Sequence, residues 1–185
     1  MRTATLGTAL TLTLTATTAL TLTLTAPAHA DAGGQVLLAS CTATMTGTYT
    51  SPLDSGSTNA QQPDSLPQTG TVTCVDDAGQ PLVRGTVTRT ADLPAAQCSG
   101  IAYNDPSTTR IAWADGTTTT LTLDQATVIA VLGTASTTGT GTATPDSTKF
   151  TGDSIDAAVM TSGPGCGTAK GQTDVASTMV FTLAH

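Results

Sequence analysis

The sequence predicts an all-β protein, a sandwich of two antiparallel sheets braced by two disulfide bonds. Threonine supplies 33 of the residues after position 30, and this β-branched, half-polar residue suits the outer face of a pleated sheet. All thirteen acidic residues are aspartate, which favours turns, and none is glutamate, which favours helices. Apolar and polar residues alternate in many short segments, whereas no apolar repeat of helical period extends beyond one turn.

Eight segments show the alternation expected of strands, and residues that favour turns (Gly, Pro, Asp and Ser) separate them. We expect their boundaries to be accurate to about 2–4 residues. The segments are residues 36–49, 69–75, 82–90, 108–114, 117–123, 127–138, 154–160 and 177–183. Short strands at this spacing, with no helix between them, predict two sheets packed face to face.

The clearest local signal is a hairpin around Asp115-Gly116, since Asp-Gly between two alternating segments is typical of a hairpin turn. A two-residue loop would place Ile111 and Trp113 on the face opposite the leucines of the next strand. A three-residue loop with a left-handed Gly116 pairs Trp113 with Thr117 and gathers all the large apolar residues on one face. We therefore expect the three-residue loop, because burial makes register strict. Trp113 is then a core residue; a ligand-stacking platform is the alternative.

Two further segments are interpreted as connections. Residues 51–68 are rich in Ser, Gln, Asn, Pro and Asp, which predicts a surface loop that could also serve binding. Residues 162–167 combine three glycines with a proline and Cys166, which predicts a tight turn tethered by its cysteine.

The first thirty residues have the layout of a secretory signal peptide. Arg2 precedes a run of Leu, Ala and Thr, and Ala28 and Ala30 occupy the −3 and −1 positions of a cleavage site. We therefore expect residues 1–30 to be removed and residues 31–185 to form a single secreted, extracellular domain. The run could instead be an uncleaved anchor or a first strand. A lipid anchor through Cys41 is another alternative, because residues 38–41 have the form of a lipobox.

The four cysteines, Cys41, Cys74, Cys98 and Cys166, all follow the expected cleavage site. An even number of cysteines in an exported chain predicts disulfides. Of the three possible pairings we favour Cys41–Cys74 with Cys98–Cys166, because an antiparallel return would bring the first two level with each other. A zinc site is not expected, since the chain has no Cys-x-x-Cys spacing.

The negative charge of the expected mature chain limits the classes of partner that it can bind. After position 30, thirteen aspartates outnumber three arginines and two lysines, for a net charge of 5 − 13 = −8. Nucleic acid and anionic membrane surfaces are therefore disfavoured. No segment after position 30 is long and apolar enough to span a membrane, so the partners we expect are an extracellular protein, an envelope component or a small molecule.

The sequence contains no arrangement of residues that amounts to an active site, so we expect a protein that is not an enzyme and has no cofactor. His29 leaves with the signal peptide and His185 is the last residue, which leaves no well-placed base for a nucleophile. Paired aspartates could serve hydrolysis or bind calcium weakly, although Asp-x-Asp-x-Asp spacing is absent. The candidates, all beside turns where aspartate is expected on structural grounds, are Asp76, Asp77, Asp153 and Asp156.

Several motifs occur together in one group of known proteins. Residues 41–52 read Cys-Thr-Ala-Thr-Met-Thr-Gly-Thr-Tyr-Thr-Ser-Pro, residues 111–118 Ile-Ala-Trp-Ala-Asp-Gly-Thr-Thr, and residues 150–153 Phe-Thr-Gly-Asp. With a cysteine before the last strand, this pattern resembles small exported immunoglobulin-like β proteins of high-GC Gram-positive bacteria, most of them uncharacterised. The resemblance spans most of the chain after position 30. It implies an immunoglobulin-like sandwich and export, and it implies no catalytic residue.

Three functions follow as hypotheses. The first is a non-enzymatic binding or structural module of the extracellular space or cell envelope. The second is a small-ligand carrier resembling the chromophore-binding apoproteins, although the cysteine spacing differs from theirs; it predicts a deep apolar crevice. The third is an aspartate-based or metal-assisted hydrolase, which predicts buried carboxylates that converge in a cleft.

Overall fold

The structure is a computed structural model that describes residues 36–53, 61–103 and 106–185. The expected signal peptide, residues 1–30, lies outside the described residues. The described part of the chain forms nine strands and no helix, and therefore no helix that could cross a membrane, so the all-β class is confirmed. The strands are β1 Leu37–Leu53, β2 Gln62–Val75, β3 Pro81–Ala96, β4 Gly100–Tyr103, β5 Ser107–Trp113, β6 Thr118–Val131, β7 Thr134–Ala143, β8 Ser154–Ser162 and β9 Gln172–Ala184.

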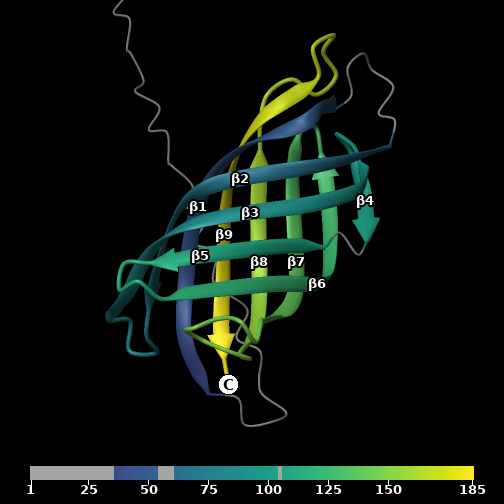
Figure 1. Cartoon of the computed structure of the whole chain (residues 1–185). Coiled ribbons are helices and arrows are strands. Elements are labelled where there is room, and N and C mark those ends of the chain that lie inside the picture. Colours follow the sequence, from purple (N-terminus) through teal and green to yellow (C-terminus); the bar gives the residue numbers. More distant parts are fainter. Residues whose placement is uncertain (1–35, 54–60, 104–105) are drawn as a thin grey trace, which may run out of the picture.

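The strands form one antiparallel sheet that closes on itself. Eight of them follow one another in the order β6-β5-β3-β2-β1-β9-β8-β7, and β7 pairs again with β6; the short β4 adds to the remaining edge of β6. The immunoglobulin-like two-sheet sandwich expected from the sequence is therefore corrected to a closed barrel. Figure 1 shows β2, β3 and β5 running crosswise in front of β9, β8 and β7, and the strands that pair with both groups are β1 and β6.

Alternation along each strand separates the barrel interior from its surface. On β1, Ala39, Cys41, Ala43 and Met45 are buried, whereas the threonines between them are exposed. Successive side chains of a strand point to opposite faces, so every second residue fills the core and the residues between them face solvent. Threonine is abundant because its branched, hydroxylated side chain fits the outer face.

One apolar cluster fills the larger part of the interior. Its largest fully buried side chains come from β5, β6, β8 and β9, and include Ile111, Leu121, Ile155 and Phe181. In eight-stranded barrels the interior is just wide enough for side chains to fill it or for one small ligand. Two smaller apolar clusters lie apart from the main one, around Leu53 and around Leu66.

The β5–β6 hairpin has the register expected from the sequence. Trp113 N donates to Thr117 O over 2.9 Å, and Gly116 has a φ of 85°, as a three-residue loop requires. Ile111 pairs with Thr119, and the large apolar residues of both strands point into the core. Trp113 is 4% exposed, which confirms it as a core residue.

The β6–β7 connection differs from the expectation of one strand over residues 127–138. The chain turns at Leu132-Gly133, where φ is 48° and 81°, so that Val131 pairs with Thr134. Positive φ at both central residues is the geometry of a two-residue hairpin that matches the twist of its strands. Leucine is rare at such a position, which is why this turn was not predicted from the sequence.

Part of the expected 51–68 loop is also strand. Residues 54–60 lie outside the described residues, but β2 begins at Gln62, which pairs with Ala96 of β3. Leu66, within the same polar segment, is buried. The prolines and polar residues of this segment suggested a loop, yet the long-range pairing with β3 places it in the barrel wall.

The four cysteines form the pairs Cys41–Cys74 and Cys98–Cys166, as favoured from the sequence. Cys41 and Cys74 stand directly opposite each other on β1 and β2, inside the barrel. The sulfur of Cys41 is thus engaged, which is incompatible with the alternative of a lipid anchor at this residue. Two disulfides indicate an oxidising environment such as the extracellular space.

Candidate functional site

The aspartates singled out from the sequence lie in separate places and do different things. Asp76 Oδ1 accepts a hydrogen bond of 2.7 Å from the backbone N of Gln80 and so stabilises the β2–β3 turn. Asp77 is exposed in the same turn, and Asp156 is exposed on the outer face of β8. Across residues 36–53, 61–103 and 106–185, no three His, Cys, Asp or Glu side chains are grouped so that they could hold a metal ion.

The remaining candidate, Asp153, is buried and contacts the chain end. Its Oδ1 lies 2.9 Å from Nδ1 of His185, whereas its Oδ2 finds no hydrogen-bond partner in the described part of the chain. The backbone of His185 also pairs with Val36 through two hydrogen bonds of 3.0 and 3.1 Å. The terminal histidine is therefore held in place and joins the end of β9 to the turn before β8.

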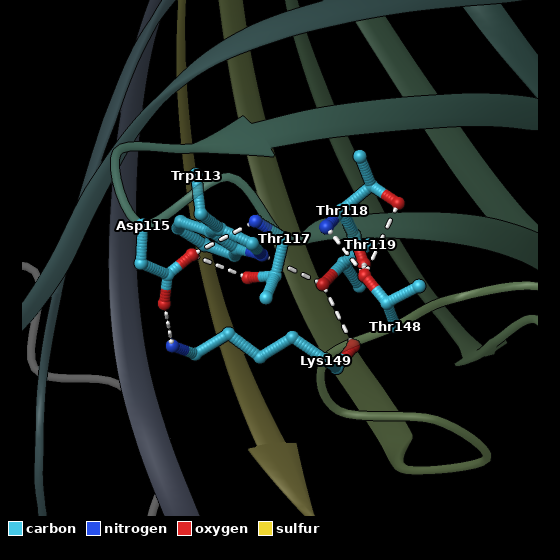
Figure 2. Close-up of polar contacts among 7 residues, drawn as sticks. All are labelled: Trp113, Asp115, Thr117, Thr118, Thr119, Thr148 and Lys149. Carbon is cyan, nitrogen blue, oxygen red and sulfur yellow. Dashed lines mark hydrogen bonds and ion pairs between the residues drawn. The ribbon is translucent and has the colours of Figure 1, made fainter.

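A second group of polar contacts surrounds Trp113 at the same end of the barrel (Figure 2). Trp113 Nε1 donates to Thr119 Oγ1 over 2.8 Å, and this hydroxyl in turn donates to the carbonyl O of Lys149 over 2.8 Å. The ring of Phe150 meets the indole edge-on, with centroids 5.9 Å apart. Because Trp113 Nε1 and Thr119 Oγ1 are hydrogen-bonded within the protein, this cluster ties the loop before β8 to the hairpin.

Asp115, at the tip of the same hairpin, is paired on the surface. Lys149 Nζ donates to its Oδ2 over 2.6 Å, and the hydroxyl and backbone N of Thr117 donate to its Oδ1. The hydrogen bond from Lys149 first, and those from Thr117 second, hold the pKa of Asp115 well below its usual range. The pair joins the tip of the β5–β6 hairpin to the loop before β8.

At the other end, the apolar core gives way to a layer of buried polar side chains. Arg89 is 5% exposed, and its Nη1 donates to Gln68 Oε1 over 2.7 Å. Gln68 Nε2 donates to Ser177 Oγ over 2.5 Å, and Ser177 shares a hydrogen bond of 2.8 Å with Thr161. Four strands, β3, β2, β9 and β8, thus contribute one continuous network across the barrel, which we call the polar layer.

A hollow lies on the polar layer. Its volume is about 60 Å³, and it is partly open to solvent. A water molecule needs about 10–15 Å³ measured in this way, so the hollow has room for several waters or one small organic molecule. Its walls include six alanines and the side chains of Leu53, Leu66 and Leu93. Its polar lining consists of Tyr49, Arg89, Gln97, Thr137 and Thr161.

The hollow lies beside a stretch of wall that strand pairing does not close. Beyond Ala91, β3 pairs with β2 only, and β4 pairs with β6 only. Residues on both sides of this gap, including Ala96 and Ala102, line the hollow. Figure 1 shows β4 as a short strand at this edge of the barrel.

The polar layer was not found from the sequence, although a signal for it exists. Arg89 is in phase with Val87 and Ala91, and Gln68 is in phase with Leu66 and Val72, so both share the face that alternation assigns to the core. A charged residue in phase with apolar neighbours on a half-buried strand is unusual. Arg89 was counted from the sequence only as one of three arginines, and its place on the core face was overlooked.

Comparison with known proteins gives no family to this chain. No protein-family model matches it, and no curated protein or solved structure matches it either. The resemblance to small exported proteins of high-GC Gram-positive bacteria therefore stays a prediction, and the function rests on the geometry of the chain itself.

Proposed function

We propose that this chain is an exported, non-enzymatic module that binds a small molecule in the hollow at the β4 end of the barrel. The observation that carries the proposal is the hollow itself: apolar walls, a polar layer as its floor, and an unpaired stretch of wall beside it. Small-molecule sites in proteins are mostly apolar concavities with a few placed polar groups. The filled remainder of the barrel holds this arrangement rigid.

The lining favours binding over catalysis. Among the described residues that line the hollow there is no aspartate, glutamate or histidine. The hydroxyls of Thr137 and Thr161 would need a base to act as nucleophiles. Burial, followed by the charge of Asp64, raises the pKa of Tyr49 to about 12, so this phenol is a neutral hydrogen-bond donor at ordinary pH. The Tyr49 hydroxyl as a donor, the Arg89 cation and the apolar walls are suited to binding a ligand and not to catalysis.

The proposal is tested by screening small organic molecules against the oxidised chain by ligand-observed NMR, with a matched pair of variants. Ala135 lines the hollow, whereas Ala112 is exposed on the outer face of β5. We expect Ala135→Phe to fill the hollow and lower the affinity for each hit about tenfold or more, because its ring takes the space of the ligand. Ala112→Phe should leave the affinity unchanged.

Two results would overturn the proposal. One is a screen without hits among molecules of up to about ten heavy atoms. The other is a set of hits that bind the native chain, Ala135→Phe and Ala112→Phe equally well, which would place them on the surface. The circular dichroism signal of Trp113 in the near ultraviolet reports whether each variant keeps its core.

A further inference from the structure

A buried arginine without an anionic partner forms part of the hollow. Arg89 projects from β3 into the barrel and is 5% exposed. The ion pairs found within the described residues are Lys149–Asp115 and His185–Asp153, and neither includes it. Transfer of an unpaired charge from water to a protein interior is costly. We therefore expect the buried guanidinium of Arg89 to have an anionic partner.

The protein satisfies only part of the guanidinium. Nη1 donates to the neutral amide oxygen of Gln68, and Nε, itself buried, has no hydrogen-bond partner in the described part of the chain. Burial lowers the pKa of Arg89 to about 10, which leaves it charged at neutral pH. Nε–H and the nearer N–H of Nη2 lie side by side on a guanidinium, and this edge fits the two oxygens of a carboxylate.

The titratable groups that interact with Tyr49 and Arg89 do not supply that carboxylate. Asp64 of β2 accepts hydrogen bonds from the hydroxyl and backbone N of Thr50, from the backbone N of Ser51 and from that of Ser65, so its carboxylate is already engaged between β1 and β2. Tyr49 stays neutral because burial raises its pKa, although the charge of Arg89 lowers it in part. The interaction shows that the phenol is within electrostatic reach of the guanidinium, where it can donate to the same anion.

We infer that Arg89 binds the carboxylate of a small apolar acid that occupies the hollow, an inference that rests on the proposed binding function. The guanidinium forms the charged part of the floor, and the leucines and alanines of the walls cover the apolar body of the acid. Among the described lining residues Arg89 is the one cation, so one negative charge is matched and a doubly charged phosphate is not. The volume of about 60 Å³ suits a short aliphatic chain, and a single ring would extend into the part that is open to solvent.

The experiment compares acids with their neutral amides. Benzoate and butyrate are titrated against the oxidised chain by isothermal calorimetry, beside benzamide and butyramide, which have nearly the same shape and no charge. We expect at least one acid to bind about tenfold or more tightly than its amide, as a charged hydrogen-bonded pair in a sheltered site should give. Inorganic phosphate is titrated as a probe of the charge alone and is expected to bind more weakly than that acid.

Three arginine variants locate the effect. Arg89→Met keeps an apolar stem and should abolish the preference for the acid while the amide still binds. Arg89→Lys keeps the charge without the paired N–H edge and should retain part of the preference. Arg110→Met, which removes an exposed arginine from the outer face of β5, should change nothing.

The outcomes separate this inference from the proposed function. If acid and amide bind equally, or Arg89→Met and Arg89→Lys keep the full preference, the carboxylate inference is wrong while binding in the hollow stands. If phosphate binds as tightly as the acids, the site is for inorganic oxyanions and the inference again fails. If neither acids nor amides bind and fragment screening also finds no ligand, both proposals fail.

Discussion

Arg89 places a full positive charge inside the barrel, and the free energy of folding should reflect it. Burial lowers its pKa from 12.5 to about 10, so the folded state disfavours the charged form. The lowered pKa corresponds to a cost of about 3 kcal/mol in the free energy of folding. This cost is present at every pH below about 10 and disappears as the pH rises from there to the ordinary pKa of 12.5. Its hydrogen bond to Gln68, from a charged donor, returns about 1.5–3 kcal/mol.

Arg89→Met removes the buried charge but leaves Gln68 Oε1 without its donor, so we expect it to change the free energy of unfolding by less than about 2 kcal/mol. Ile111→Ala, at a fully buried apolar position, should cost about 2–5 kcal/mol. Urea denaturation at pH 7 measures both. A loss for Arg89→Met as large as that for Ile111→Ala would mean that the guanidinium holds the barrel together and is not retained for a ligand.

At the scale of elements, the β5–β6 hairpin is braced by the ion pair between Asp115 and Lys149 (Figure 2). Since the pKa of Asp115 is lowered in the folded state, its contribution to stability is present above the ordinary value near 3.9 and is lost as the pH falls below it. The pair lies at the surface, so its effect is modest and is weakened by salt.

Asp115→Asn tests this pH dependence. Asparagine can still accept the hydrogen bonds from Thr117 through its amide oxygen, but it carries no charge for Lys149. We expect the variant to be less stable than the native chain at pH 7, and the difference to shrink steadily from about pH 5 to pH 2. Denaturant unfolding across this range measures it, with Asp156→Asn on the outer face of β8 as the control. A difference that is independent of pH would exclude the ion pair as its source.

The two hairpins of β6 show what the sequence could and could not predict. The β5–β6 turn was predicted with the correct register, because Asp115-Gly116 has the chemistry of its turn and Trp113 must point inward. The β6–β7 turn was missed, because Leu132, 80% exposed at a φ of 48°, has no such chemistry. Residues 128–132 are a continuous apolar run and residues 134–138 are mostly threonine and serine, so residues 127–138 look like one strand.

At the scale of the whole molecule, the sequence predicts strands and faces but not how the sheet is joined. Alternation assigns side chains to the interior equally well in a sandwich and in a barrel. What distinguishes them here is the pairing of β7 with β6, which depends on the overlooked turn and on contacts between distant segments. The hollow could not be predicted from the sequence either, because its lining comes from seven strands and is assembled only when the barrel closes.

The two disulfides act at opposite ends of this barrel, so their removal should have different effects. They close loops with sequence separations of 33 and 68, and restriction of the unfolded chain is expected to contribute about 4 kcal/mol for each. Cys41–Cys74 lies within the main core. Cys98–Cys166 instead joins connections at the hollow: Gly133 N donates to Cys98 O over 3.1 Å, and Gly163 N donates to Gly133 O over 3.2 Å.

We expect replacement of Cys98 and Cys166 by alanine to release this end locally as well as to lower global stability. Hydrogen exchange should show the amides of Gly133 and Gly163 opening more easily than the amide of Ala114, which bonds to Arg84 O at the far end. Binding to the hollow should weaken with the same variant. Replacement of Cys41 and Cys74 should lower protection of all three amides together and leave the affinity of the folded chain unchanged. Equal behaviour of the two variants would show that the hollow does not depend on the disulfide beside it.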